Sequence, residues 1–346
     1  MAIQLPVEKF GSIRTPFYFY DTNILRQTLS AINAETSKYG NFFVHYAVKA
    51  NANIKVLKVI NEAGLGIDCV SGGEIEQVLA AGFPANKIVF AGVGKSDWEI
   101  ELGLEKGILC FNVESIPELE VINEIAGKMN KQATVCFRIN PNVGAHTHAN
   151  ITTGLADNKF GIAMADMEKV IAMAQDMKNI TFKGLHFHIG SQILEMDDFV
   201  ALCNRINELQ DQLEAAGIKM EIINVGGGLG VDYADPINNP IPNFADYFAT
   251  YNKYLKLRPG QTVHFELGRA VVCQCGALIT KVNYVKSNSL QTYENEKDAG
   301  VKNFVIVDAG MTDLIRPALY DAHHKTINLC STQPEETYDV VGPIGE

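Results

Sequence analysis

Short apolar, β-branched runs recur eight times along the chain, and this rhythm constrains the fold more than any other feature. Their near-continuous hydrophobicity is typical of parallel strands that are covered on both faces. Helical patterns lie between them, and several open with Ser or Asp and close at Gly, as capped helices do. Early strand centres are roughly 21 to 27 residues apart, about the length of one βα unit. The runs span residues 42–50, 66–71, 87–92, 108–113, 134–141, 182–190, 221–227 and 262–268.

This alternation predicts an α/β fold of the (β/α)8 TIM-barrel type, with a doubly wound parallel sheet as the alternative. After about residue 270 the pattern changes to strand-like runs that are separated by polar loops instead of long helices. We therefore expect a barrel over residues 22–268 and a β-rich, barrel-like second domain formed by residues 1–21 plus 269–346. A strand-like run at residues 15–21 precedes the barrel and could also join it.

Composition limits the class of partner. The 29 Lys and Arg residues face 40 Asp and Glu residues, and the net charge of -11 argues against nucleic acid as a partner. No apolar run has membrane-spanning length, and the N-terminus lacks the apolar segment of an export signal. We expect a cytoplasmic protein that binds a small molecule.

The cysteines form an odd, unpatterned set of seven, without a CxxC pair. This usage is typical of reduced thiols in a cytosolic protein. Cys273 and Cys275, two residues apart, are expected to face the same side of a strand. Without a second such pair they do not predict a zinc site, and we expect no metal.

Polar residues follow the predicted strands where each strand ends, which is where chemistry collects in this type of barrel. Lys49 ends an apolar run, so it is either a salt-bridged lysine at the barrel rim or an amine whose pKa burial lowers, fit to bond a carbonyl. His186 and His188 alternate on one strand and are expected to face the same side. They are either satisfied core histidines or half of a metal site, and the latter needs ligands from other strands.

Two further strand ends complete a set. Gly226, Gly227 and Gly228 are either a flexible turn or a phosphate cradle after the seventh strand. Glu266 ends the eighth strand, where a carboxylate across the mouth from Lys49 could keep a ring nitrogen protonated. A carbonyl-binding lysine, phosphate-binding glycines, a ring-stacking histidine and a ring-pairing acid are together what pyridoxal phosphate requires.

At these positions the chain resembles the alanine-racemase-like, fold-type III class of pyridoxal phosphate enzymes, and within it the diaminopimelate decarboxylase family. The resemblance runs from about residue 15 to the end of the chain. The stretch from Thr147 to Ile162 and the HFHIGSQ run are close to the decarboxylase pattern. The motifs that carry it are YAVKAN, GIDCVSGGE, FRINPNVGAHTHANITTGLADNKFGI, GLHFHIGSQ, NVGGGLG, ELGR, DAGMTDLIRPALY and VVGPIGE.

The resemblance implies a role for each matching residue. Lys49 is expected to be the Schiff-base lysine, His188 the residue that stacks on the cofactor ring, and Glu266 the pyridinium partner. The phosphate contacts are expected from Ser191 with the three glycines. We assign Asp68, Gly268 and Arg269 to the same cofactor site. The residues expected to bind the substrate are Arg269, Arg316, Tyr320 and Glu346.

The implied reaction is the loss of carbon dioxide from meso-2,6-diaminopimelate to give L-lysine, the last step of bacterial-type lysine biosynthesis. The family also implies a homodimer with shared active sites. Fork-shaped arginines suit the far carboxylate of such a substrate. Arg316 argues against a sister decarboxylase of arginine, ornithine or carboxynorspermidine, because two positive charges would face each other. Without the family, a plain salt bridge would be the expected role of Arg316.

Two departures from the family pattern stand out. Leu267 replaces a proline in the motif ELGR, and we expect little effect because Glu266, Gly268 and Arg269 are retained. Gly345 stands where the family has a catalytic cysteine, and the sequence then stops at Glu346. We therefore expect a chain that is truncated at its C-terminus, with an incomplete β domain. A non-catalytic or inactive pyridoxal phosphate-binding relative is the alternative function, and a metal-dependent barrel hydrolase is a more distant one.

Overall fold

The computed structural model describes residues 2–146, 152–155, 158–290 and 300–345, and it divides into two compact units. The barrel unit comprises residues 22–231 and 241–273, and the β-rich unit comprises residues 1–21, 232–240 and 274–346. Residues 269–273 belong to the barrel unit and residues 232–240 to the β-rich unit, whereas the boundaries expected from the sequence assign each segment to the other.

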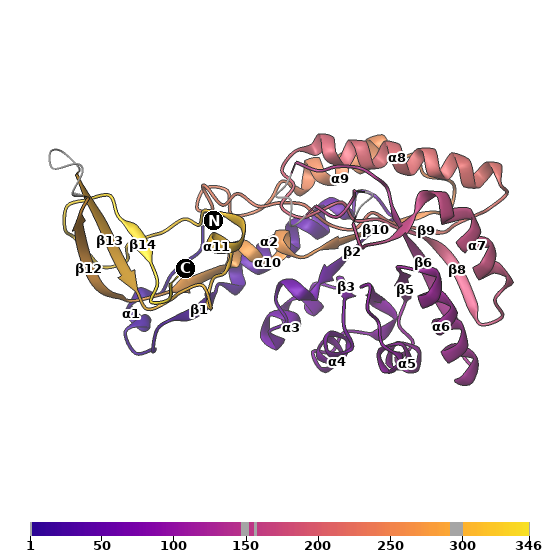
Figure 1. Ribbon diagram of the computed structural model, residues 1–346, viewed down its shortest axis with the longest axis horizontal. Helices are drawn as coiled ribbons and strands as arrows, with labels where there is room; N and C mark the ends of the chain where they lie inside the picture. The colour runs from indigo at the N-terminus through magenta and orange to yellow at the C-terminus, as the bar shows by residue number, and fades with distance from the viewer. Residues whose placement is uncertain (1, 147–151, 156–157, 291–299, 346) are drawn as a thin grey trace. The chain divides into compact units, whose positions relative to one another are not determined.

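The eight predicted strands form, and they close into a parallel barrel in which the last strand pairs with the first (Figure 1). The two-residue strand β7 (Ile162–Ala163) adds to β6 beside this ring. The confirmed fold is therefore the (β/α)8 barrel and not the doubly wound sheet. The barrel strands are β2 (Phe42–Ala47), β3 (Gly66–Cys69), β4 (Ile88–Phe90), β5 (Cys110–Val113), β6 (Ala133–Asn140), β8 (Ile180–His186), β9 (Ile222–Asn224) and β10 (Thr262–Leu267).

Helices follow the strands and cover the barrel from outside (Figure 1). Their starts are encoded locally, because the hydroxyls of Ser71 and Ser115 accept the backbone N–H of the residue three positions on. Ser96 and Glu99 form a reciprocal capping box, and the helix that they begin ends at Gly107 with a positive φ of 68°. The helices are α2 (Thr22–Thr36), α3 (Ile54–Glu62), α4 (Gly72–Ala80), α5 (Asp97–Lys106), α6 (Ile116–Lys128), α7 (Met167–Asp176), α8 (Met196–Ala215), α9 (Phe244–Tyr254) and α10 (Arg269–Val272).

Strand β10 shows how packing orients the polar residues. Phe265 lies between the rings of Phe42 and Tyr251, with centroids 5.1 Å away in each case, and it is fully buried. Burial of such a side chain stabilises the fold by roughly 1.5–3 kcal/mol. Because successive side chains of a strand point to opposite faces, fixing Phe265 against helix α9 turns Glu266 to the barrel interior.

The β-rich unit contains two small sheets. Strand β1 (Phe17–Tyr20) pairs antiparallel with β11 (Gly276–Ile279), so the run at residues 15–21 does not join the barrel. The second sheet has the order β12 (Val282–Ser289), β13 (Val301–Val307), β14 (Asp339–Val341). Two short helices, α1 (Val7–Phe10) and α11 (Arg316–Tyr320), complete the unit. The expected change to β structure near residue 270 is thus confirmed.

The cysteine prediction was partly wrong. Cys273 and Cys275 lie in one 3₁₀ turn, Cys273–Cys275, and do not share a strand face. All seven cysteines are within the described residues and none forms a disulfide. None of the helices in the described ranges combines the length and the hydropathy needed to cross a bilayer.

Candidate active site at the carboxyl ends of the barrel strands

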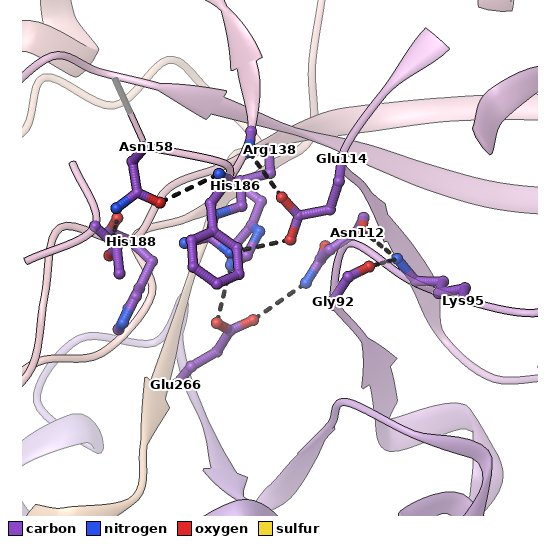
Figure 2. A network of polar contacts seen from close by, with 12 residues as sticks. Gly92, Lys95, Asn112, Glu114, Arg138, Asn158, His186, His188 and Glu266 are labelled. Carbon is purple, nitrogen blue, oxygen red and sulfur yellow. Dashed lines mark hydrogen bonds and ion pairs between the residues drawn. The ribbon is translucent and has the colours of Figure 1, made fainter. Parts of the chain in front are cut away.

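Side chains from three other barrel strands converge on Glu266 of strand β10 (Figure 2). Its Oε1 accepts hydrogen bonds from the side-chain amides of Asn112, at 3.1 Å, and Asn224, at 2.8 Å. Its Oε2 accepts one from Nε2 of His186 at 2.9 Å. Glu266 is only 8% exposed, so these three donors replace the water that a buried carboxylate loses.

The charge of Glu266 follows from these contacts. Burial alone would raise the pKa of this carboxyl, but the charge of His186 and its hydrogen bond, with a further hydrogen bond from Asn224, lower the pKa to about 2. Glu266 is therefore ionised at neutral pH. It offers a fixed negative charge in the barrel interior to a cationic or N–H-bearing ring.

His186 and His188 have different hydrogen-bond partners, and only His186 lies within the strand on which both were expected. Strand β8 ends at His186, which points to Glu266. His188 lies beyond the strand, and its Nδ1 accepts the backbone N–H of Gly227 at 3.2 Å. Burial, together with the positive charges of Lys49 and Arg138, lowers the pKa of His188 well below its ordinary value. A neutral ring with an unprotonated Nδ1 is what the Gly227 contact requires.

The glycine run packs directly against neighbouring backbone. A Cβ at Gly226 would collide with the carbonyl of Phe187, and one at Gly227 would collide with the carbonyl of Glu266. Gly226 also has a positive φ of 70°, which side chains disfavour. The run is therefore a close-packed turn beside both His188 and Glu266, and not a flexible one.

Ser191, expected to bind the phosphate, lies next to Arg269, which was assigned to the cofactor site. Nε and Nη2 of Arg269 donate to the hydroxyl of Ser191 at 3.3 and 3.2 Å. Gly268 faces the turn that carries Lys49, because a Cβ there would lie 3.1 Å from Ala47 Cβ. These contacts join the ends of strands β2 and β10 with the loop after β8.

Of the two interpretations of Lys49, the structure does not support the buried amine. Strand β2 ends at Ala47, and Lys49 lies on the following 3₁₀ turn (Val48–Ala50) with an exposed side chain. Nearby Asp68 is buried, and burial with the charge of Glu266 raises its pKa well above the ordinary value, while Lys49 opposes this. The Asp68 Oδ1 has no hydrogen-bond partner among the described residues. An exposed lysine beside acidic groups remains able to bond a carbonyl.

The β-rich unit holds Arg316 and Tyr320. The Arg316 guanidinium carbon lies 4.4 Å from the ring centroid of Tyr233 and 5.8 Å from that of Tyr320. Its Nε and Nη1 are buried and find no acceptor in the part of the chain that the structure describes. Among the described residues Arg316 therefore has no salt-bridge partner, the role that the sequence without the family suggested. Glu346, also predicted to bind substrate, lies outside the described residues.

Several contributors were not found from the sequence. Asn112 and Asn224, which hold Glu266, and Glu114, which holds Arg138 at 3.0 Å, were not singled out. Each is a polar residue within or directly after an apolar strand, and that signal was available. Tyr233 carried no comparable signal. In the described ranges, no group of three or more His, Cys, Asp or Glu side chains is placed to hold a metal ion.

The barrel residues fit the parts of pyridoxal phosphate. An ionised carboxylate suits a protonated ring nitrogen, and a glycine turn without side chains beside a serine and an arginine suits a phosphate. The buried Asp68 oxygen that lacks a partner among the described residues is a further acceptor at the same end of the barrel.

Comparison with known proteins gives a consistent result. Residues 25–273 match the model of the family described as "Pyridoxal-dependent decarboxylase, pyridoxal binding domain". The diaminopimelate decarboxylase of Bacteroides thetaiotaomicron is 67% identical over 99% of this chain and 86% of that protein, and that of Haemophilus influenzae is 42% identical over 100% and 80%. The crystal structure of the Helicobacter pylori diaminopimelate decarboxylase complexed with L-lysine has a TM-score of 0.88 at 37% identity, covering 98% of this chain and 81% of that one. The chain therefore belongs to the diaminopimelate decarboxylase family of pyridoxal-dependent decarboxylases.

Proposed function

We propose that this chain binds pyridoxal phosphate and decarboxylates meso-2,6-diaminopimelate to L-lysine. The observation that carries the proposal is the ionised Glu266, held by donors from three other strands beside the glycine turn. Relatives named diaminopimelate decarboxylase match nearly the whole chain, which favours this substrate over others.

The cofactor and the barrel divide the chemistry. When bound, pyridoxal phosphate supplies a ring that accepts the electron pair left behind by the departing carboxylate. Lys49 would hold the cofactor through its aldehyde carbon. Glu266 would keep the proton on the ring nitrogen, since a pKa of about 2 leaves the carboxylate charged at neutral pH. The three donors on Glu266 prevent it from turning away.

The remaining barrel residues would bind the cofactor and orient it. Ser191, Arg269 and the turn of Gly226 to Gly228 would bind the phosphate, and Gly268 lets the Lys49 turn approach. His188 is held by its bond to Gly227 in a neutral form, which can lie flat against a cationic ring without charge repulsion. Asp68 would accept a hydrogen bond at the same end of the barrel.

Arg316 supports a dicarboxylate substrate. Two of its nitrogens are buried and lack acceptors among the described residues, while tyrosine rings cover its charge. A half-buried guanidinium with two such nitrogens can bind an anion and repels an ammonium. This favours diaminopimelate over arginine, ornithine or carboxynorspermidine. Tyr320 and Glu346 stay predictions for the same substrate, as do the homodimer with shared active sites and the cytoplasmic location.

The first experiment is an absorbance titration of the protein with pyridoxal phosphate, followed by diaminopimelate and an assay for lysine. The wild-type protein should gain the visible band of a lysine-bound pyridoxal, and Lys49→Ala should not. Lys55→Ala, at an exposed lysine on helix α3, is the matched control. A band that persists in Lys49→Ala would refute the assignment of Lys49, and a bound cofactor without lysine formation would support the binding-only alternative.

The substrate assignment has a separate test. Arg316→Ala should raise KM for diaminopimelate by about 10-fold or more, since it removes a charged hydrogen-bond donor from the carboxylate. Arg26→Ala is the control, because Arg26 forms an exposed pair with Glu62 at 2.7 Å. Full affinity for diaminopimelate in Arg316→Ala would sink the substrate assignment.

A further inference from the structure

Lys95 and Glu118 form a buried ion pair next to strand β5. Nζ of Lys95 is 2.7 Å from Oε1 of Glu118, and the two side chains are 1% and 9% exposed. The same ammonium donates to the backbone carbonyls of Gly92 at 2.9 Å and Asn112 at 2.8 Å. Its three protons therefore have three acceptors, and it links the ends of β4 and β5 to the first turn of helix α6.

The pair holds one short stretch of backbone at two points. Lys95 binds the carbonyl of Asn112, and Oε2 of Glu118 accepts the backbone N–H of Glu114 at 2.9 Å. Residues 112–114 are thus fixed from one side by a single buried pair. Such a pair is weak evidence for stability, because desolvation offsets much of the attraction, but it can define one arrangement among several.

The side chains of this stretch reach the proposed active site. The Asn112 amide donates to Glu266 at 3.1 Å. The Glu114 carboxylate accepts Nη1 of Arg138 at 3.0 Å and the backbone N–H of Gly161 at 2.7 Å. The position of the backbone at residues 112–114 therefore decides whether both contacts can form.

We propose that Lys95 and Glu118 are positioning residues for the cofactor site, which they control through Asn112 and Glu114. The pair sets the Asn112 amide on the carboxylate that would face the ring nitrogen, and it sets Glu114 on Arg138 and on the turn at Gly161. The inference rests on the proposed function for its cofactor readouts, but its prediction for the backbone does not need the cofactor.

The test replaces both charges at once, because a single substitution would leave the partner charge buried. Lys95→Met/Glu118→Leu should weaken pyridoxal phosphate binding about 10-fold, as expected for one lost hydrogen bond to a charged group. It should also shift the pH dependence of the cofactor's absorbance. In the cofactor-free protein, exchange of the Glu114 and Gly161 amide protons should become faster. The matched control is Lys183→Met/Glu221→Leu, an ion pair of the same 2.7 Å length whose side chains are 32% and 66% exposed.

Three outcomes decide the matter. A folded double variant with wild-type cofactor affinity, absorbance profile and amide exchange would overturn the proposal and leave the pair a structural role only. If the double variant does not fold, Glu118→Gln replaces it, since one amide oxygen can serve Lys95 or the Glu114 N–H but not both. With that variant, unchanged affinity and exchange overturn the proposal equally. A wild-type protein that binds no cofactor sinks the proposed function instead, and amide exchange still tests the positioning.

A double-mutant cycle distinguishes an effect of the ion pair on the position of Asn112 from a general loss of rigidity in the barrel. If the pair acts through Asn112, the losses of cofactor affinity from Asn112→Ala and from the Lys95/Glu118 replacement should be less than additive. Fully additive losses would overturn the route through Asn112. Lys95→Arg retains the charge and the hydrogen-bond donors, so this variant should bind the cofactor more tightly than the Lys95/Glu118 double variant.

Discussion

Glu266 and His264 lie two residues apart on the same face of strand β10, yet the barrel treats them in opposite ways. Both are buried, with 8% and 7% exposure, and both have a lowered pKa. For Glu266 the pKa of about 2 means a charge that His186 stabilises against the effect of burial. For His264 burial, with a smaller effect of His45, lowers the pKa to about 3, which means a neutral ring.

The partners of the two residues explain the difference. His264 shares a 2.7 Å hydrogen bond with Nε2 of His45, whose Nδ1 is 3.3 Å from the Lys87 carbonyl, and Thr262 lies on its other side at 3.1 Å. In this row of hydrogen bonds each ring nitrogen has a partner although both rings are neutral. Glu266 receives donors only, so it must be charged. A buried charge is costly without such donors. The barrel provides these donors at Glu266, which is two residues closer than His264 to the carboxyl end of strand β10. The resemblance places the cofactor at this end.

The largest expected effect comes from removing the charge at the functional end. Glu266→Gln keeps the shape but not the charge, so the ring nitrogen would lose its partner. We expect kcat to fall by about 10²- to 10³-fold, in the range found when one preorganised electrostatic group is removed. Steady-state lysine formation would measure this. Glu124→Gln, at an exposed pair with Lys128, is the control. A loss of less than about 3-fold would contradict the role of Glu266 and erase the difference between the two residues.

His264, the neutral residue, should instead affect how the free energy of unfolding depends on pH. The pKa of His264 falls from 6.5 to about 3 on folding, so between these values the unfolded chain binds a proton that the folded chain does not. Its contribution is intact above pH 6.5 and declines as the pH falls, by on the order of 2 kcal/mol at about pH 5. Burial lowers the pKa of His45 as well, which acts in the same direction. Glu266 acts lower, as the pH falls from 4.5 through about 2.

His264→Gln would test this window. The amide does not titrate and can still bond His45 and Thr262, so the free energy of unfolding should fall less steeply between about pH 6.5 and pH 4.5. Urea unfolding at several pH values would measure the slope, with the exposed His323→Gln as the control. An unchanged slope would show that His264 is not the group that makes this end of the barrel sensitive to acid. Lysine formation at neutral pH should stay close to wild type.

The same comparison shows what the sequence could predict. The strands could be predicted because both of their faces are covered, which requires continuous apolar runs. Glu266 could be predicted because it is a charged residue at the end of such a run. Its partners were not, because Asn112 is 154 residues away and Asn224 is 42 residues away, and only closure of the barrel brings them together.

Errors arose where a strand ended earlier than its apolar run. The apolar run around Lys49 continues past Ala47, so a buried amine was one of the two interpretations of this lysine, but the chain leaves the strand and exposes it. The same cause leaves His188 beyond the end of the strand that carries His186. Lys95 shows the reverse case, and no feature of the sequence singled it out. It precedes a helix cap in a polar segment, yet its side chain is almost completely buried, because its acceptors come from Gly92, Asn112 and Glu118.

The smallest expected effect concerns a second charge at the functional end. The Arg138 guanidinium carbon lies 4.5 Å from the centroid of the Phe160 ring, while Glu114 holds the same group by a hydrogen bond. Phe160→Leu removes the ring but keeps the ion pair, so cofactor affinity should fall only about 2- to 5-fold, in keeping with roughly 0.5–1 kcal/mol for a partly exposed cation–π contact. Phe304→Leu, which removes a ring 5.7 Å from the Lys302 ammonium in the β-rich unit, is the matched control and should leave the affinity unchanged. A loss of 100-fold would mean that Phe160 itself touches the bound molecules. No loss would mean that Glu114 alone holds Arg138, so that hydrogen bonds account for the whole charged end just as they account for the neutral one.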